Sequence, residues 1–218
     1  MPNPLHSRSP IIGVLALQGD YASHARALED IGAEARMVRT KEDLAEVDGL
    51  IIPGGESTTF LKLLEREGLF QPLLTFCETR PTFGTCAGCI LLATKVLRPE
   101  QQSLGVLNAT VERNAYGRQI DSDIFTGETS LPGGPLEMVF IRAPRIENVG
   151  DGVNVLAKRD GRPVLVRQKN VLAATFHPEL SQSDDRRVHR YFVQMVKDSM
   201  ENDRTPSFAD QTAPADSQ

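Results

Sequence analysis

The sequence predicts an α/β fold, doubly wound around a mostly parallel sheet. The apolar runs 11–17 and 49–53 are continuous, which is typical of parallel strands buried on both faces. Helical patterns alternate with such runs in the order β-α-β-α-β. Short strands separated by turn dipeptides follow in the C-terminal half, and they predict an antiparallel meander added to the parallel core.

The length and charge of the chain limit its organisation. The 218 residues fit one domain over 11–200, with a disordered arm at 1–10 and a disordered polar tail at 201–218. The net charge of −5 argues against a nucleic-acid or anionic-membrane partner, and no apolar run is long enough to span a membrane. Three cysteines form no even-numbered disulfide framework, so we expect a reducing compartment, the cytoplasm.

The first half of the chain supplies the parallel core. Asp20 is the expected N-cap of a helix that buries Ala22, Ala25, Leu28 and Ile31 and stops at Gly32. The remaining elements predicted in this half are strands at 33–39, 49–53 and 81–83 and helices at 41–47, 60–67, 69–79 and from 90 to 93.

The second half is predicted to be richer in strands. Turns are expected at Asp160-Gly161 and Lys169-Asn170, a loop at 130–135, and no element is assigned to 114–119. The predicted strands are 104–107, 109–113, 136–142, 153–158, 164–167 and 171–176, followed by a closing helix at 184–200.

The sequence Gly84-Thr85-Cys86-Ala87-Gly88 lies between a buried strand and a helix. This is the context of a nucleophile elbow, with Cys86 where esterases carry serine. The glycines leave room for the sharp turn, and a helix N-terminus favours the thiolate over the thiol. The alternative interpretation is that Cys86 is a small buried apolar residue.

A second motif supports the nucleophile. His177 and Glu179 follow an apolar strand and are two residues apart, which places them on the same side of an extended chain. A cysteine, a histidine base and a carboxylate that orients the base form a catalytic triad. Cys86 and Cys89 also spell C-x-x-C, but a zinc site would need a second ligand pair; a redox pair stays open, and Cys89 is more simply structural.

Gly54-Gly55 follows the third strand and precedes Glu56-Ser57-Thr58-Thr59. Glycines at the carboxyl end of a strand allow close backbone approach and direct amide groups into the crevice. A plain turn with a helix cap is the alternative for this loop. His24 and His189 fall on predicted helices, and we interpret both as structural.

Several segments together resemble the glutaminase subunits of pyridoxal 5′-phosphate synthase, within the triad glutamine amidotransferases. They are 13–19, 52–59, 84–88, 111–119, 140–144 and 176–180. The resemblance implies the flavodoxin-like fold of class I glutamine amidotransferases. It also implies hydrolysis of L-glutamine through a glutamyl thioester on Cys86, with His177 as base and Glu179 orienting it.

The resemblance further implies the surroundings of the substrate. Glutamine would lie among Gly54, Gly55, Glu56, Arg113, Ile141 and Arg142, and backbone N–H groups of Ala87 and Gly54 would hold the oxyanion. No metal or cofactor is implied. The ammonia would pass to a separate, barrel-type synthase subunit within a hetero-oligomer, and Gln18 is a candidate contact for that subunit.

Other functions remain open at this point. The chain could serve an amidotransferase with another acceptor, although the segment around Arg113 favours the first assignment. It could be a redox or chaperone protein with a cysteine on an elbow, which would have no use for His177. It could also be a non-catalytic binding module, against which the intact set of Cys86, His177 and Glu179 argues.

Overall fold

The computed structural model describes residues 8–113 and 123–204. The unassigned stretch 114–119, most of the expected arm and the tail from residue 205 lie outside these ranges. Within the described ranges, no helix has the length and apolar character needed to cross a membrane.

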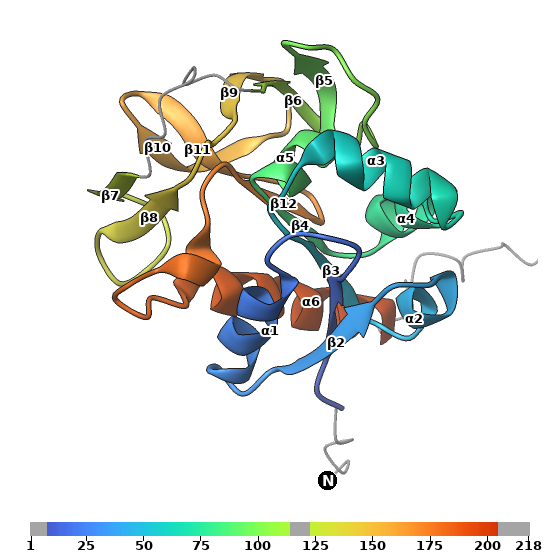
Figure 1. The fold of residues 1–218 in the computed structure, drawn as a ribbon. Helices are drawn as coiled ribbons and strands as arrows, with labels where there is room; N and C mark the ends of the chain where they lie inside the picture. The colour runs from blue at the N-terminus through green and yellow to red at the C-terminus, as the bar shows by residue number, and fades with distance from the viewer. Residues whose placement is uncertain (1–7, 114–122, 205–218) are drawn as a thin grey trace, which may run out of the picture.

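One seven-stranded sheet forms the centre of the molecule (Figure 1). Its strands, in spatial order, are β10 (Asn154–Arg159), β11 (Arg162–Gln168), β12 (Val171–Ala174), β4 (Thr82–Thr85), β3 (Gly49–Ile52), β1 (Ile11–Leu15) and β2 (Glu34–Val38). The five strands from β12 to β2 are parallel, whereas β10, β11 and β12 pair antiparallel. The predicted fold class, a parallel core with a C-terminal meander, is therefore confirmed.

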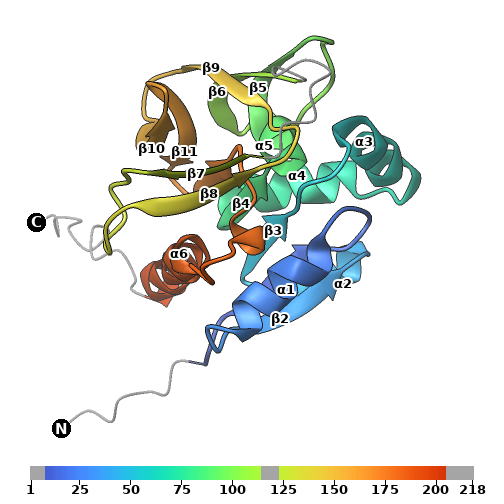
Figure 2. The ribbon, with the colours of Figure 1, turned by 60° about the vertical axis from the view of Figure 1, so that its left-hand side comes forward.

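Helices cover both faces of this sheet (Figures 1 and 2). Helices α1 (Tyr21–Glu29) and α6 (Arg187–Arg204) lie on one face; α2 (Lys41–Ala45), α3 (Ser57–Arg66), α4 (Phe70–Thr79) and α5 (Ala87–Leu92) lie on the other. Successive side chains of β3 alternate between them: Ile51 packs in the α1–α6 cluster, and Leu50 and Ile52 pack in the opposite one. Because side chains of a strand alternate in direction, the apolar run serves two cores.

Local capping explains where two helices begin. Asp20 caps α1 as predicted, its carboxylate accepting a hydrogen bond from the N–H of Ser23 at 3.3 Å. Helix α3 begins at Ser57, three residues before the predicted start, because Glu56 accepts from the N–H of Thr59 at 2.7 Å. A side chain that satisfies a free N–H group of the first turn fixes the start of a helix.

The smaller strands were the least predictable part of the fold. The sequence pattern does not predict β5 (Ala93–Leu97), β7 (Asp123–Gly127) or β9 (Arg145–Val149), which pair with β6 (Leu107–Glu112) and β8 (Leu136–Phe140) in two small sheets. The strand predicted at 104–107 was wrong apart from its last residue. Leu104 instead anchors a loop, its N–H donating to the carbonyl of Leu91 at 2.7 Å.

The ends of the predicted domain also carry structure. Arg8 pairs with Asp48 at 2.6 Å, and α6 continues four residues past the expected end at Met200. The division into an arm, a domain at 11–200 and a tail stays a prediction.

The parallel pairing of β3, β4 and β12 aligns their carboxyl ends. Ile52 is in register with Gly84, and Thr85 with Ala174. The packing behind this edge is tight: a Cβ on Gly88 would lie 2.1 Å from the carbonyl oxygen of Ile52. Backbone therefore meets backbone where the elbow turns, and only glycine fits.

We expect Gly88→Ala to destabilise the protein by more than about 3 kcal/mol, because the new methyl group collides with backbone rather than with a flexible side chain. Gly32→Ala is the control: its Cβ meets nothing within 4 Å, and its φ of +72° alone costs roughly 1–2 kcal/mol. Urea denaturation measures both. Equal losses for the two variants would contradict the packing argument.

Candidate active site

Cys86 occupies a strained position at the end of β4. Its backbone is left-handed, with φ 47° and ψ −103°, and α5 begins at the next residue. The N–H of Cys86 donates to the carbonyl of Ala174 at 2.9 Å, which ties the elbow to β12. Left-handed conformations are unfavourable for residues with a side chain and persist only where surrounding structure imposes them. The predicted elbow is therefore present, with its cysteine 7% exposed.

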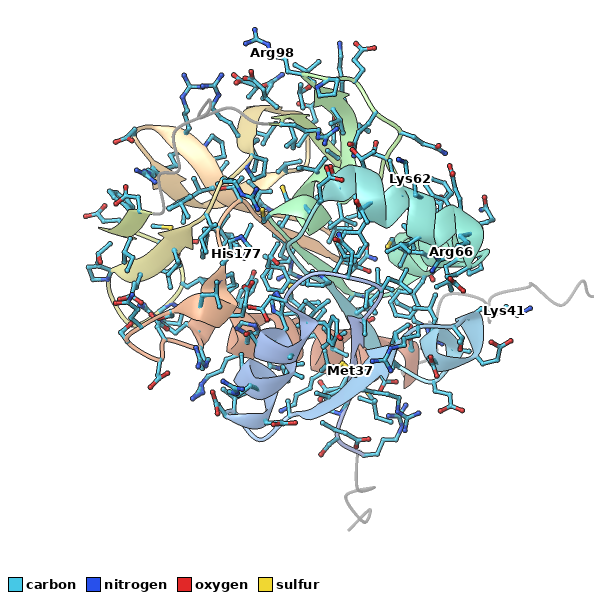
Figure 3. All side chains as sticks on the ribbon, viewed as in Figure 1. Met37, Lys41, Lys62, Arg66, Arg98 and His177 are labelled. Atoms are coloured by element: carbon cyan, nitrogen blue, oxygen red, sulfur yellow. The ribbon has the colours of Figure 1, made fainter. Side chains whose placement is uncertain are left out.

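His177 reaches the same place from the end of β12. Its Nδ1 lies 2.7 Å from Oε1 of Glu179, and its backbone N–H donates to the carbonyl of Val139 at 2.8 Å. The extended chain expected here was wrong: β12 ends at Ala174, and a 3-10 turn over Pro178–Leu180 brings the carboxylate back to the imidazole. In Figure 3, His177 lies near the middle of the view, whereas Arg98 and Lys41 lie at the outline of the molecule, and His177 is buried.

The electrostatics favour a charged His177. Burial opposes the charge, but hydrogen bonds to Cys86 and Glu179 raise the pKa of His177 to about 10. Burial also opposes the carboxylate, yet its contacts with the N–H dipole of His24 and with the charged ring of His177 lower the pKa of Glu179 to about 2. Since Nδ1 faces Glu179, the other ring nitrogen, Nε2, is the one available to exchange a proton with Cys86. The geometry therefore places an imidazolium beside the sulfur of Cys86, where its positive charge can stabilise a nucleophilic sulfur.

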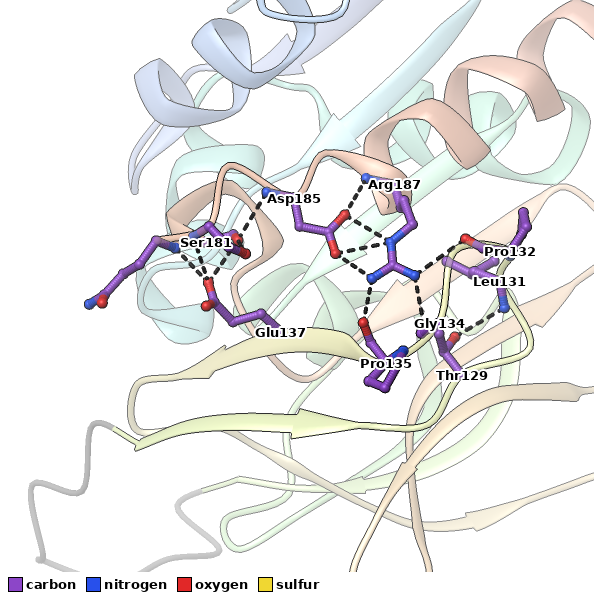
Figure 4. A network of polar contacts seen from close by, with 11 residues as sticks. Thr129, Leu131, Pro132, Gly134, Pro135, Glu137, Ser181, Asp185 and Arg187 are labelled. Atoms are coloured by element: carbon purple, nitrogen blue, oxygen red, sulfur yellow. Dashed lines mark hydrogen bonds and ion pairs between the residues drawn. The ribbon is translucent and has the colours of Figure 1, made fainter.

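The chain beyond Glu179 is held by strand β8 (Figure 4). Oε1 of Glu137 accepts from the hydroxyl of Ser181 at 2.8 Å and from the N–H of Gln182 at 2.6 Å. Arg187 pairs with Asp185 and donates to three carbonyl groups of the loop 132–135. These contacts hold the chain directly after the turn that carries Glu179 against β8 and its preceding loop.

A cavity of about 400 Å³ opens over Cys86 and His177. Within the described ranges, no three His, Cys, Asp or Glu side chains are grouped to hold a metal ion. The residues that line the cavity are Asp20, Gly54, Gly55, Glu56, Ser57, Cys86, Ile90, Arg113, Ile141, Arg142, Pro144, His177 and Leu180. All six residues expected around the substrate are among them.

Gly54 allows the imidazole to approach. A Cβ at this position would lie 2.4 Å from Cε1 of His177 and 3.4 Å from Cβ of Cys86. The loop is braced by Gln18, from the bend after β1, whose Nε2 donates to the carbonyl of Glu56 at 2.9 Å. Ala87, the other expected oxyanion donor, follows the nucleophile directly and is buried. The glycines thus have a steric function beyond that of a plain turn.

Two of the expected binding residues contact each other. Nη2 of Arg113 lies 2.9 Å from Oε1 of Glu56 and 3.0 Å from Oγ1 of Thr58. The other carboxylate oxygen of Glu56 caps α3, so this residue has a structural function as well as a place at the cavity. Arg142 has a left-handed backbone, with φ 44°, at the cavity edge. Glu56 and Arg113 therefore place a negative and a positive charge side by side at the cavity.

Sequence reasoning missed several lining residues. Asp20 was assigned only as a helix cap, and Ser57, Ile90 and Leu180 were given no function at the site. Each follows a strand or the elbow at the same sheet edge, which is the signal that could have found them.

The other two cysteines differ from Cys86. Burial raises the pKa of Cys77 and of Cys89 to about 12, so both stay thiols at neutral pH. Cys89 is fully buried in α5. The C-x-x-C pair therefore lacks the reactive partner that a redox site needs.

Comparisons with known proteins all point to the glutamine amidotransferases. The model of the SNO glutamine amidotransferase family matches residues 14–198. A protein of Koribacter versatilis (strain Ellin345) named pyridoxal 5′-phosphate synthase subunit PdxT is 62% identical over 186 residues, which cover 85% of this chain and 95% of that protein. Its namesake from Corynebacterium jeikeium (strain K411) is 54% identical over 195 residues, covering 86% and 97%.

Solved structures extend the similarity. A crystal structure of a glutamine amidotransferase matches with a TM-score of 0.80 at 49% identity, covering 85% of this chain and 98% of that one. A putative GMP synthase subunit from Thermoplasma acidophilum matches with a TM-score of 0.68 at 17% identity, covering 92% and 100%. At that identity the second match supports the fold alone.

The charges of His177 and Glu179 predict a pH-dependent contribution to stability. The raised pKa of His177 stabilises the fold fully below pH 6.5, and this contribution is lost as the pH rises toward 10. The lowered pKa of Glu179 stabilises it fully above pH 4.5, and this contribution is lost as the pH falls toward 2. Both contributions are complete only between pH 4.5 and 6.5.

We therefore expect the stability difference between the wild type and Glu179→Gln to be largest between pH 4.5 and 6.5 and to shrink on both sides. Urea denaturation across this range measures the difference. A difference that does not vary with pH would show that the pair is not charged in the folded protein.

Proposed function

The chain belongs to the SNO glutamine amidotransferase family, and we infer that it is a glutaminase subunit that supplies ammonia to pyridoxal 5′-phosphate synthesis. The observation that carries the chemistry is that Cys86 and His177 line one cavity while Nδ1 of His177 lies 2.7 Å from Oε1 of Glu179. These three residues are the parts needed for acyl transfer: a nucleophile, a proton carrier and a group that orients the carrier.

In the proposed reaction, the thiolate of Cys86 attacks the side-chain amide carbon of glutamine. The carbonyl oxygen becomes an oxyanion, which the N–H groups of Ala87 and of the Gly54-Gly55 loop would stabilise. Nε2 of His177 gives its proton to the amide nitrogen, and ammonia leaves. Water then attacks the thioester and passes a proton to His177, releasing glutamate and the Cys86 thiolate.

Substrate orientation is assigned to the charged groups of the cavity. Arg113 and Arg142 suit the α-carboxylate of glutamine, and Glu56 suits the α-ammonium group. The contact between Arg113 and Glu56 supports this assignment. The α-carboxylate and α-ammonium group of an amino acid are adjacent, so they need a positive and a negative side chain that also lie side by side. Ile141 provides apolar contact beside them.

The acceptor of the ammonia is proposed to be a barrel-type synthase subunit in a hetero-oligomer with this chain. The support is the family and the names of the relatives, which are subunits of that synthase. We also propose that docking adjusts the Gly54-Gly55 peptide, since Gln18 at the candidate contact already braces this loop. Three unpaired cysteines, one of them reactive, suit the cytoplasm.

Reconstitution with the synthase subunit tests the proposal. We expect pyridoxal 5′-phosphate to form with glutamine as nitrogen source. Cys86→Ala should abolish this synthesis, because the variant lacks the nucleophile. An ammonium salt should restore synthesis in the same variant, because it bypasses glutamine hydrolysis. The readout is the absorbance of the product. Synthesis from glutamine by the variant would contradict the proposal.

The same preparation tests docking control. Glutamine hydrolysis should rise strongly when the synthase subunit is added. Equal rates with and without it would refute control by docking, while leaving the reaction itself in place.

A further inference from the structure

A second layer of buried polar groups lies behind Glu179. His24, on α1, is fully buried, whereas Ala22, which the sequence placed on the buried face, is exposed. Nε2 of His24 lies 3.3 Å from Oε2 of Glu179 and 3.1 Å from Oγ1 of Thr85. Helix α1 therefore buries a polar side chain, His24, while the apolar Ala22 two residues earlier faces solvent, and this arrangement calls for a physical explanation.

The carboxylate of Glu179 supplies one. Its Oε1 serves His177, and its Oε2 is fully buried with no well-directed hydrogen bond from the described residues. Nε2 of His24 lies 3.3 Å from Oε2 and 3.1 Å from Oγ1 of Thr85, so an N–H at Nε2 lies between these two oxygens. A buried carboxylate oxygen with no polar group beside it would be costly, and the partial positive charge of this N–H lowers that cost.

His189, on α6, determines which nitrogen of His24 carries the proton. Nε2 of His189 lies 3.1 Å from Nδ1 of His24. If His24 were protonated on Nδ1, the lone pair of its Nε2 would face the carboxylate, and Nδ1–H of His189 would be a buried donor without a partner. With the proton on Nε2 of each ring, His189 donates to His24, and His24 presents its N–H to Glu179 and Thr85.

The neutral state of both rings preserves this arrangement. Complete burial lowers the pKa of His24, although Glu179 opposes the shift, and burial lowers the pKa of His189 to about 3. A neutral His24 leaves His177 as the cation that pairs with Glu179. The titratable and charged groups that act on the two rings are Glu179, His177 and Asp20 for His24, and His24, Glu179 and Arg186 for His189.

We propose that His24, oriented by His189, is a positioning residue that holds Oε2 of Glu179 so that Oε1 stays directed at His177. This inference rests on the proposed function for the role of Glu179. It assigns α1 and α6, the two helices on one face of the sheet, a direct part in aligning the triad.

The test compares two polar substitutions of His24 in the full-length protein with the synthase subunit present. The amide of His24→Gln reaches about as far as Nε2 and keeps a donor facing Glu179. The amide of His24→Asn is shorter and keeps only the contact toward His189. We expect His24→Asn to lower kcat for glutamine about ten-fold with little change in KM, and His24→Gln to stay near the wild type.

The second readout is alkylation of Cys86 by iodoacetamide as a function of pH. In His24→Asn, Glu179 should take up a proton at higher pH than in the wild type, so the acidic limb of the alkylation profile should move upward. Cys77 and Cys89 are buried and their pKa values are raised, so they do not compete. Leu28→Ala is the control. It leaves a cavity in the core beside the same helix, so it should lower stability without moving this limb.

The proposal is overturned if His24→Asn behaves like Leu28→Ala, with reduced stability but unchanged kcat and pH profile, or if the Gln and Asn variants are equally impaired. If His24→Asn does not fold, His189→Leu, which replaces the ring that orients His24 by an apolar side chain, should give a smaller shift in the same direction, and no shift would overturn the proposal. Failure of the proposed function is separable, because alkylation of Cys86 requires no glutamine.

Discussion

The parallel pairing of β3, β4 and β12 is the constraint on which the site depends. It brings the ends of three strands to one edge, so that segments starting near residues 53, 86 and 175 meet although the sequence separates them widely. The meeting is close enough to exclude a methyl group at Gly54, against His177, and at Gly88, against Ile52. The catalytic residues can therefore meet only because these two positions lack a side chain, so the glycines are part of the site.

Charge within the site is arranged in two layers. In the first, Cys86 and His177 line a cavity that opens to solvent, and Glu179 pairs with His177 behind it. In the second, neutral His24 and His189 lie in the apolar cluster between the sheet and the helices α1 and α6. A buried carboxylate keeps its charge only if dipoles or cations surround it, and the two layers together supply both.

Most of the frame was predictable, because continuous apolar runs and the elbow motif are strong local signals. The small sheets and the turn at Pro178–Leu180 were not, because tertiary contacts rather than periodicity determine them: β5 follows α5 with no break in the sequence pattern. The triad residues were found from the elbow motif and from spacing, whereas His24 was interpreted only as structural and its contact with Glu179 was not predicted. Its burial depends on the position of Glu179, which no helical pattern of α1 reveals.

In the proposed reaction, the sulfur of Cys86 carries the acyl group during turnover. Rapid acid quenching of the enzyme with glutamine and the synthase subunit, followed by peptide mass spectrometry, detects such an acyl group. We expect a glutamyl thioester on the peptide segment that carries Cys86, at that residue and not at Cys89. A glutamyl group found on another residue, or turnover that proceeds with no acylated enzyme at any quench time, would contradict it.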